Sequence, residues 1–460
     1  MLGDLRGGCD DPGGEGTDAS AQRSARIAVL VVHSRASDGE HLSACRACNR
    51  GSARRGEGRL SRGGVNCRES TADIRVLHVG KFYPPARGGM EKVLQVLAEA
   101  ERGHVENHVL VANEGPTTIH ETVNGVVVTR VGAVARVGAV AICPTFPYWM
   151  RTLDADVMVV HEPNPVAIVA HALVRPASRL VFWVHAEVVR PAWRYRLFYR
   201  PFLRRMLRLA DRIVVASPQV AACAAELQPF REKCTVIPYA LDPDQHALTP
   251  EVSARVAEII AASRLPIVLF VGRLVPYKGV DVLLRALVTA KAQAVIVGDG
   301  PLLGALEALA HELGVADRTR FARNVDTSEL SALYNACDLF VLPSITRAEA
   351  FGMVQLEAMS CRKAVISTEL PSGVPWVNQH GVTGLVVPPG DSQALGAGID
   401  TLLGDPQLSA RMGENGRARV EREFSIGRLV DQTTSLYRSL TGHAERAGSV
   451  SVPLASSHTD

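Results

Sequence analysis

The sequence lacks the features of several common protein classes. It contains no run of about 18 or more apolar residues, the length that a helix needs to cross a membrane, so no membrane span is expected. The net charge of +3 over 460 residues provides no basic excess that would favour nucleic acid. The nine cysteines are an odd number and most lie singly in apolar segments, which is typical of buried thiols in a reducing compartment rather than of disulfides. These absences favour a cytoplasmic protein.

Signatures of cofactor binding are missing as well. The sequence has neither the G-x-G-x-x-G pattern of dinucleotide-binding domains nor a P-loop. The spacing Cys45-x-x-Cys48 fits a zinc site only loosely, and a chance origin in low-complexity sequence explains it better. We therefore expect no zinc site and no resident cofactor of these kinds.

Residues 1–72 differ from the rest of the chain. They are rich in Gly, Arg and Ser, contain no lysine and show no sustained hydrophobic period. Such a composition cannot bury enough apolar surface to offset the entropy of ordering, so the segment is expected to be a disordered extension. An over-extended start of the reading frame would explain it. Residues 442–460 are expected to be a disordered tail.

The remaining sequence alternates short apolar runs with helical patterns, which is typical of a parallel sheet covered by helices on both faces. One cycle begins with "IRVLHVG" and a second begins with "PIVLFVGRL". The sequence therefore predicts an α/β protein with two doubly wound, Rossmann-like halves, residues 73–245 and 246–424, facing a cleft. A helix over residues 425–441 is expected to pack back on the first half. In such sheets ligands bind at the carboxyl ends of the strands.

The loop "GRLVPYKGVD" follows a predicted strand and carries two cations. Arg273 and Lys278 lie between Gly272 and Gly279. Arginine can bind a diphosphate through two parallel hydrogen bonds, and lysine acts as a compact charge. A diphosphate site is one interpretation, and two solvated surface cations are the other.

A glycine pair, Gly88-Gly89, opens a predicted helix directly after the first strand of the first half. Glycines let the backbone approach a phosphate, and the start of a helix supplies free N–H donors. Taken alone, the pair is a weak signal.

The stretch "EAFGMVQLE" gives the strongest indication of chemistry. Glu349 and Glu357 are eight residues apart, and a continuous helix would turn through about 800° between them. Both can face one ligand if Glu349 lies in a loop and the helix starts after it, with the N–H groups of Gly352, Met353 and Val354 pointing to the same ligand. Paired carboxylates suit a hydroxyl-rich ligand such as sugar and ribose. A helix-capping acid plus a surface acid is the alternative.

Together these segments resemble the retaining glycosyltransferases of family 4, which have the two-domain GT-B fold. The matching segments occur in the expected order; they are "GGMEKVLQVLAE", "VHAE", "VIPYALD", "FVGRLVPYKGVDVLLRAL", "VIVGDGPLLGALEALA", "ACDLFVLPS", "EAFGMVQLE" and "HGVTGLVVPPGD". One departure is Tyr239-Ala240, where the family usually shows Asn-Gly.

The resemblance implies transfer of a hexose from a nucleotide-sugar, such as a GDP- or UDP-hexose, to an acceptor hydroxyl, with retained anomeric configuration and no required metal. It implies that Arg273 and Lys278 hold the donor diphosphate and neutralise the leaving group. It also implies that Glu357 binds the ribose and that Glu349 lies beside the donor sugar.

The same resemblance assigns residues of the first half. Gly88 and Gly89 would approach the distal phosphate, and His185 would take the place of the active-site histidine. His161 also ends a predicted strand, so it is the alternative. His185 is favoured because the loop after it leads into the presumed acceptor region.

That loop leads into a basic stretch, Arg190 to Arg208, with seven arginines, several aromatic residues and no acid. Such a stretch can lie on an anionic lipid surface at the inner face of a membrane. A core helix whose arginines reach the surface is the alternative. Nucleic acid is disfavoured because no base-reading motif accompanies the stretch.

The expected function is therefore hexosyl transfer to a lipid-linked glycan in a cell-surface or exopolysaccharide pathway, by a cytoplasmic or peripheral membrane protein. Three alternatives stay open: a soluble acceptor, a non-catalytic partner protein, and a sugar-nucleotide epimerase of the same fold.

Overall fold

The computed structural model describes residues 74–86, 88–138, 140–185 and 199–442. All of these residues belong to one unit of the chain, Arg68–Asp460. The expectations for residues 1–72, for Cys45 and Cys48, and for the tail beyond residue 442 lie outside the described residues. The first part of the basic stretch, residues 190–198, also lies outside them.

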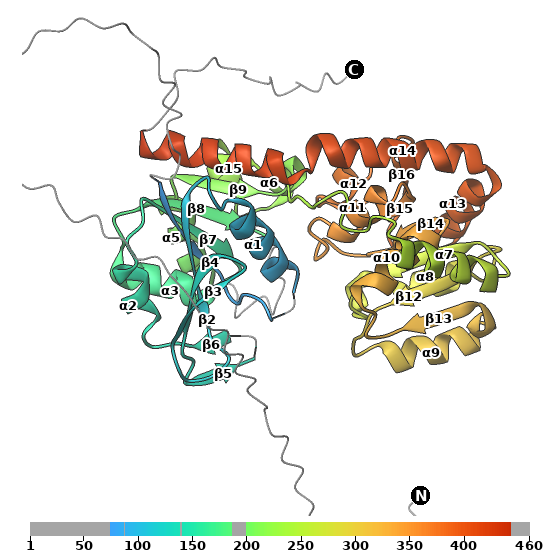
Figure 1. The fold of residues 1–460 in the computed structure, drawn as a ribbon, viewed down its shortest axis with the longest axis horizontal. Coiled ribbons are helices and arrows are strands. Elements are labelled where there is room, and N and C mark those ends of the chain that lie inside the picture. The colour runs from blue at the N-terminus through green and yellow to red at the C-terminus, as the bar shows by residue number, and fades with distance from the viewer. Residues whose placement is uncertain (1–73, 87, 139, 186–198, 443–460) are drawn as a thin grey trace, which may run out of the picture. The chain divides into compact units, whose positions relative to one another are not determined.

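The described residues of the first half form an eight-stranded sheet in the order β10-β9-β8-β7-β1-β2-β4-β3 (Figure 1). Its strands are β1 (Arg75–Val79), β2 (Glu106–Ala112), β3 (Ile119–Val123), β4 (Val126–Val131), β7 (Val157–Glu162), β8 (Arg179–Val184), β9 (Arg212–Val215) and β10 (Cys234–Val236). Its helices are α1 (Gly89–Ala100), α2 (Phe146–Thr152), α3 (Pro165–Val174), α5 (Arg200–Leu209) and α6 (Pro218–Cys223). Neighbouring strands are parallel except for β3 and β4.

The second half forms a six-stranded parallel sheet in the order β13-β12-β11-β14-β15-β16. Its strands are β11 (Ile267–Val271), β12 (Gln293–Val297), β13 (Thr319–Ala322), β14 (Leu339–Leu342), β15 (Ala364–Thr368) and β16 (Gly384–Val387). Its helices are α7 (Pro250–Ala262), α8 (Val280–Ala286), α9 (Leu303–Glu312), α10 (Thr327–Ala336), α11 (Met353–Ser360), α12 (Val374–Val377), α13 (Ser392–Gly404) and α14 (Pro406–Glu423). The prediction of two doubly wound α/β halves is confirmed.

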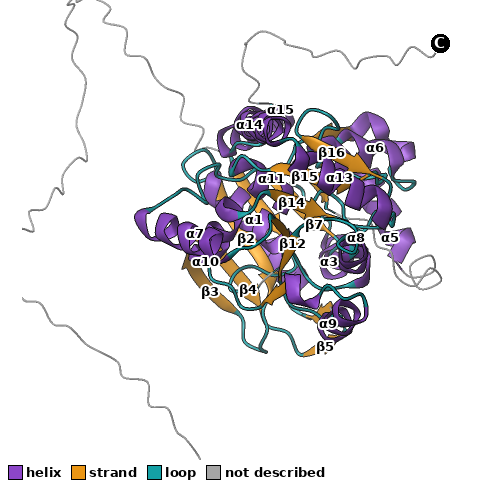
Figure 2. Ribbon diagram, turned by 90° about the vertical axis from the view of Figure 1, so that its right-hand side faces the viewer, coloured by secondary structure: helices purple, strands orange, loops and turns teal. Residues whose placement is uncertain are grey.

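Both faces of the central strands are buried, as a parallel sheet requires. Val159 and Val181 belong to one hydrophobic cluster, whereas Met158 and Phe182 belong to another on the opposite face. This alternation follows from the two-residue period of a strand. Helices accordingly flank the strands in Figure 2, where helices are purple and strands are orange.

An antiparallel addition to the first sheet was not expected from the sequence. β3 pairs with β4 through a turn at Asn124-Gly125, both with positive φ (49° and 79°). Asn-Gly between apolar runs is a strong hairpin signal, so this hairpin could have been predicted from the sequence. A short hairpin of β5 (Ala135–Val137) and β6 (Val140–Ile142) follows.

The strand order reverses beside β1 in the first sheet and beside β11 in the second. A ligand crevice opens at such a point, at the carboxyl ends of the strands. The loop that leads to Gly88-Gly89 follows β1, and the loop with Arg273 and Lys278 follows β11. The fold therefore places these residues where ligands bind in sheets of this kind.

The C-terminal helix α15 (Ile426–Thr441) contacts α1 and β7, whereas α14 contacts α11 and β15. The Tyr437 hydroxyl lies 3.0 Å from Glu101 Oε1, at the end of α1. Where α14 ends, the Leu241 N–H donates to the Phe424 carbonyl at 3.1 Å. The two chain segments that connect the halves are thus hydrogen-bonded to each other, and α15 packs on the first half.

Candidate active site

Lys278 and Glu349 form a buried ion pair at the carboxyl end of the second sheet. Lys278 Nζ lies 2.6 Å from Glu349 Oε2, and the two side chains are only 10% and 11% exposed. The Ser344 hydroxyl donates to the same carboxylate oxygen at 3.0 Å. Two charges taken out of water need such close pairing and extra hydrogen bonds to offset their desolvation. Sequence reasoning placed both residues at the site but missed that they pair with each other.

The pair forms because two loops meet. Lys278 follows β11 and Glu349 follows the neighbouring strand β14, so both loops leave the same edge of the sheet. Between them Gly279 has φ +65°, and a Cβ there would lie 2.1 Å from the Pro343 carbonyl oxygen. Only glycine fits that backbone and that approach, so Gly279 lets the two loops pack together.

Arg273 lies in the same loop as Lys278, but its side chain is exposed. A Cβ at the preceding Gly272 would lie 3.5 Å from Lys278 Nζ. A side chain at position 272 would therefore contact the ammonium group, and glycine places none there. An exposed guanidinium and a held ammonium on one short loop can approach an anion together.

Glu357 occupies α11, which begins after Gly352. Gly352 has φ +75°, and a Cβ there would lie 2.6 Å from Leu342, so glycine is required where the chain turns into the helix. The Tyr334 hydroxyl donates to Glu357 Oε2 at 2.7 Å. Burial raises the pKa of Glu357, while Tyr334 and the positive charge of Lys92 act in the opposite direction. The structure thus provides a carboxyl group in low-dielectric surroundings, with Tyr334 and Gln245 as hydrogen-bond donors.

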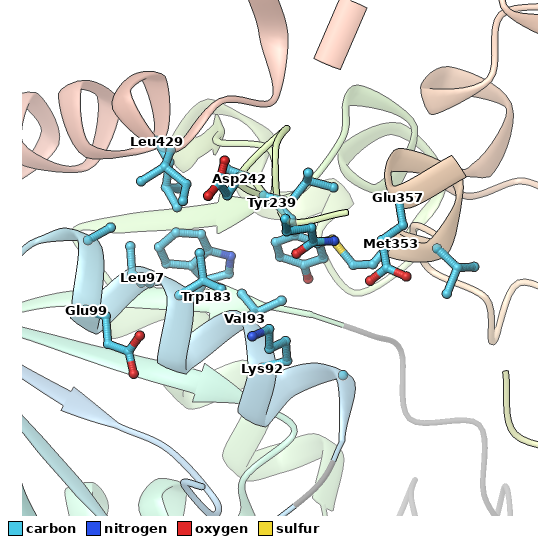
Figure 3. Close-up of a pocket in the computed structure, with 18 residues that line it drawn as sticks. Lys92, Val93, Leu97, Glu99, Trp183, Tyr239, Asp242, Met353, Glu357 and Leu429 are labelled. Atoms are coloured by element: carbon cyan, nitrogen blue, oxygen red, sulfur yellow. The ribbon is translucent and has the colours of Figure 1, made fainter. Parts of the chain in front are cut away.

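A cavity of about 550 Å³ adjoins Glu357 (Figure 3). Its walls come from α1, the end of β8, residues 239–245, α11 and α15; they are Gly89, Lys92, Val93, Val96, Leu97, Glu99, Ala100, Trp183, Tyr239, Ala240, Leu241, Asp242, Gln245, Met353, Val354, Glu357, Ile426 and Leu429. Two helix starts, at Gly89 and at Met353, contribute to it. A largely apolar hollow with a few polar groups is typical of a ligand site.

The structure divides the predicted site residues into groups. Gly89, Met353, Val354 and Glu357 line the cavity. Lys278, Glu349, Arg273 and Gly272 lie together around the loops after β11 and β14. Gly88 and Gly352 are the capping residues just before α1 and α11 and do not line the cavity.

His185 and His161 are not alternatives in the structure, because they hydrogen-bond to each other at 2.8 Å. His185 is buried, and its other ring nitrogen lies 2.7 Å from the Tyr239 hydroxyl. Direct contact of His185 with a sugar stays a prediction, since both ring nitrogens are engaged by protein groups.

Three residues near the site were missed by sequence reasoning. Lys92 follows the glycine pair in the first turns of α1, and Tyr334 and Trp183 lie in apolar segments that read only as core. A lysine near the start of a helix is a usable signal, because the helix dipole disfavours a cation there. The two aromatic residues gave no signal, since their polar atoms matter only through tertiary contacts.

In the described part of the basic stretch, some side chains are buried or paired within the protein and are not available to a membrane surface. In α5, Leu203, Met206 and Leu207 are buried. Two of its arginines pair with one acid from another segment: Arg200 and Arg204 lie 2.6 Å and 2.9 Å from Glu226. Among the described residues no helix combines the length and apolar character that a membrane crossing needs.

Two family profiles match consecutive parts of the chain. The profile described as "Glycosyltransferase Family 4" matches residues 87–245, and the one described as "Glycosyl transferases group 1" matches residues 256–419. The first covers the first half from just before α1 to beyond β10, and the second covers all strands of the sheet that begins with β11. The family model for each half therefore agrees with the division seen in the structure.

Curated relatives cover most of the chain. O-antigen chain mannosyltransferase C of Escherichia coli is 32% identical over 80% of this chain and 99% of its own. D-rhamnosyltransferase WbpZ of Pseudomonas aeruginosa is 34% identical over 76% of this chain and 92% of its own. A GDP-mannose-dependent α-(1-6)-phosphatidylinositol monomannoside mannosyltransferase of Mycolicibacterium smegmatis is 29% identical over 74% and 92%.

Solved structures share the fold at lower identity. Sucrose-phosphate synthase of Thermosynechococcus elongatus superposes with a TM-score of 0.68 at 22% identity, covering 81% of this chain and all of that one. Anabaena HepE in complex with UDP gives a TM-score of 0.64 at 22% identity over 80% of this chain. With two largely parallel sheets, the matching profiles and relatives above 30% identity, the chain belongs to the family 4 glycosyltransferases of GT-B fold.

Proposed function

We propose that this glycosyltransferase moves a hexose from a nucleotide-sugar to an acceptor hydroxyl with retention of configuration. We further propose that the acceptor is a lipid-linked glycan of a cell-surface polysaccharide. The observation that carries the proposal is the buried Lys278–Glu349 pair beside Arg273, close to the carboxyl ends of β11 and β14. The relatives named for mannosyl and rhamnosyl transfer support a hexose, and one of them is named as GDP-mannose-dependent with a phosphatidylinositol glycan acceptor.

The cations act on the leaving group. Cleavage of the sugar–phosphate bond leaves negative charge on the departing diphosphate and positive character on the sugar. Lys278 and Arg273 stabilise the charge on the diphosphate, and the pairing with Glu349 holds the Lys278 ammonium group in place before the reaction. The Glu349 carboxylate lies on the side of the sugar, where it favours developing positive charge.

The nucleoside half of the donor binds by hydrogen bonds. Glu357, held by Tyr334, accepts hydrogen bonds from the ribose hydroxyls. The N–H groups at the starts of α11 and α1, from Met353 and Gly89 onward, face anionic groups of the donor. These contacts exist before and during the reaction, so they serve binding more than the chemical step.

A divalent metal is not required in this proposal, because Arg273 and Lys278 supply the positive charge that a metal supplies elsewhere. An Asp-x-Asp element, Asp242-Pro243-Asp244, does follow β10, and Asp242 lines the cavity. Asp244, however, pairs with Arg417 at 2.7 Å. Its carboxylate is therefore already engaged by a cation of α14.

A donor panel tests the proposed function. GDP-mannose, UDP-glucose and ADP-glucose are added to the full chain, and the unfolding temperature is measured. A ligand at 100 times its Kd stabilises the native state by about 2.7 kcal/mol, so one base class should raise the unfolding temperature clearly. Transfer from that donor to a lipid-linked acceptor, followed by NMR of the product, should show the anomeric configuration of the donor, with and without EDTA.

Other results would contradict parts of this scheme separately. A product with inverted anomeric configuration would contradict the retaining mechanism. Loss of transfer in EDTA with recovery in magnesium would contradict the proposal that no divalent metal is required. Absence of a shift with every nucleotide-sugar would favour a non-catalytic protein of this fold.

We also propose that the first half attaches reversibly to an anionic membrane surface through α3 and α5. These helices contact each other and expose Val169 and Leu173 on α3 and Phe202 and Leu209 on α5. Arg208, next to Leu209, is exposed as well. Exposed apolar side chains beside a basic residue suit the boundary between lipid headgroups and chains, and each basic residue contributes about 1 kcal/mol there.

Vesicle co-sedimentation checks this attachment. The wild type should sediment with vesicles that contain anionic lipid, and less so at high salt, because charges are screened over about 8 Å at physiological ionic strength. Phe202→Ser with Arg208→Glu should abolish sedimentation. Arg264→Glu, an exposed position before β11 with the same change of charge, should behave as wild type. Negligible wild-type binding to both lipid types would favour a soluble acceptor.

A further inference from the structure

Three histidines from neighbouring strands form a buried row in the first sheet. His78 belongs to β1, His161 to β7, and His185 follows β8; these strands are adjacent. His78 Nδ1 lies 3.3 Å from His161 Nε2, and His161 Nδ1 lies 2.8 Å from His185 Nε2. Within the described ranges no group of three or more His, Cys, Asp or Glu is arranged to hold a metal ion. The three rings instead lie in a line, with a ring nitrogen of each histidine facing a ring nitrogen of the next.

The histidine at each end of this row lies within hydrogen-bond distance of one further polar side chain. Glu101 Oε2 lies 2.8 Å from His78 Nε2, and both of these side chains are completely buried. The Tyr437 hydroxyl of α15 holds the other carboxylate oxygen of Glu101 at 3.0 Å. At the opposite end the Tyr239 hydroxyl lies 2.7 Å from His185 Nδ1. The network thus runs without a break from α15 to the segment that connects the two halves.

The carboxylate sets the direction of these hydrogen bonds. Ionised Glu101 can only accept, so His78 Nε2 carries a proton and donates it. A neutral imidazole has one donor and one acceptor nitrogen, so with all three rings neutral His78 Nδ1 accepts from His161, whose Nδ1 accepts from His185. Burial favours the neutral form of His161 and of His185, because it lowers the pKa of His161 well below its ordinary value and that of His185 to about 3. His185 Nδ1 must then accept the hydroxyl proton of Tyr239.

The far end of this network reaches the cavity. Tyr239 and Trp183 both line it, together with Glu357 (Figure 3). A hydroxyl of Tyr239 that donates to His185 can only accept from a ligand. Trp183 stacks on His185 at 5.9 Å between ring centres, and its buried Nε1–H has no hydrogen-bond partner among the described residues. A buried donor without a partner is costly, so two residues of this wall carry one unused donor and one directed acceptor.

We propose that Trp183 and Tyr239 form a subsite for a hydroxyl group of the glycosyl ligand, and that Glu101 is a positioning residue that sets the polarity of this subsite through the three histidines. A sugar hydroxyl both donates and accepts, so it matches the two groups. The inference rests on the glycosyl transfer proposed above. Tyr239 stands at the position where the family usually shows asparagine in this motif.

The role of Glu101 is tested by histidine-selective ¹⁵N NMR on the full chain. The wild type should show His78, His161 and His185 each protonated on Nε2 alone. In Glu101→Gln the amide can offer either its oxygen or its nitrogen to His78, so both directions of the row become possible and mixed tautomers are expected at all three histidines. Tyr437→Phe is the matched control, because it removes a partner of Glu101 but keeps the carboxylate. A single, unchanged tautomer set in Glu101→Gln would overturn the role of Glu101.

The subsite is tested by comparing ligands with and without the sugar. Tyr239→Phe keeps the ring but loses the hydroxyl, and Trp183→Phe keeps an aromatic side chain but loses the indole N–H. Each should raise the Kd of GDP-mannose or UDP-glucose about three- to tenfold, the worth of one hydrogen bond. The Kd of free GDP or UDP should not change. Tyr83→Phe is the control, since that buried hydroxyl finds no partner in the described structure and lies in a separate cluster.

Three outcomes decide between the parts of the inference. Unchanged affinity for the nucleotide-sugar in both variants would overturn the subsite. Equal losses for the nucleotide-sugar and the free nucleotide would also overturn it, because the contact would then be to the nucleotide. Failure of every nucleotide to bind the wild type would overturn the proposed function together with the subsite, whereas the tautomer result would still decide the role of Glu101.

Discussion

Replacing Lys278 or Arg273 by methionine is expected to lower kcat by about two to three orders of magnitude, because each change removes a fixed positive group at the departing diphosphate. Loss of one such stabilising donor costs about 2.7–4 kcal/mol in comparable sites. Turnover with the donor identified by the panel measures the effect. Arg264→Met is the matched control: Arg264 is exposed at the opposite end of β11 and should leave turnover unchanged.

Stability must be separated from catalysis for Lys278. Its ammonium group is buried against Glu349, and removal of one partner of a buried pair costs about 3–5 kcal/mol because the remaining charge is left unpaired. The double variant Lys278→Met with Glu349→Gln removes both charges and should recover most of the unfolding temperature without recovering activity. Arg273→Met, at an exposed position, should lose activity with no loss of stability. Wild-type turnover in both Arg273→Met and the double variant would show that the diphosphate does not bind at this loop.

Glu357→Gln is expected to weaken the binding of the nucleoside diphosphate by roughly 10- to 150-fold, because hydrogen bonds to a charged group are worth about 1.5–3 kcal/mol. The ribose hydroxyls do not react, so kcat at saturating donor should change much less than KM. Isothermal titration with GDP or UDP measures the loss. Tyr334→Phe keeps the carboxylate but removes one of its donors, so a smaller loss is expected.

The pH dependence of this binding has a defined sign. Burial raises the pKa of Glu357, so the carboxylate that accepts the hydrogen bonds is lost as the pH falls, beginning above the usual range of a glutamate. The affinity for nucleotide should therefore decrease towards acid pH in the wild type. The contribution of this group should be absent in Glu357→Gln. Equal affinity and an identical pH profile in wild type and variant would show that the ribose does not bind to Glu357.

Much of the fold could be predicted because it depends on local patterns. The apolar run at residues 74–80 contains β1, and the run at residues 266–274 contains β11, since buried parallel strands have continuous apolar sequence. Gly352 marked the start of α11 because only glycine readily adopts its positive φ. The structure accordingly places Glu349 in a loop and Glu357 in a helix. The hairpin of β3 and β4 was missed although its Asn-Gly turn was visible.

The sequence by itself determined the fold class and the family, and it brought the cations and acids of the second half to one edge of one sheet. Only the tertiary structure decided how those groups pair. The hydrogen bond between His78 and His161 joins residues 83 positions apart, and the one between Tyr437 and Glu101 joins residues 336 positions apart. Periodicity reports which face of an element is buried, but not which polar atom on a distant element meets it there. A buried histidine next to apolar residues therefore looks the same in the sequence whether it is idle or part of a directed network.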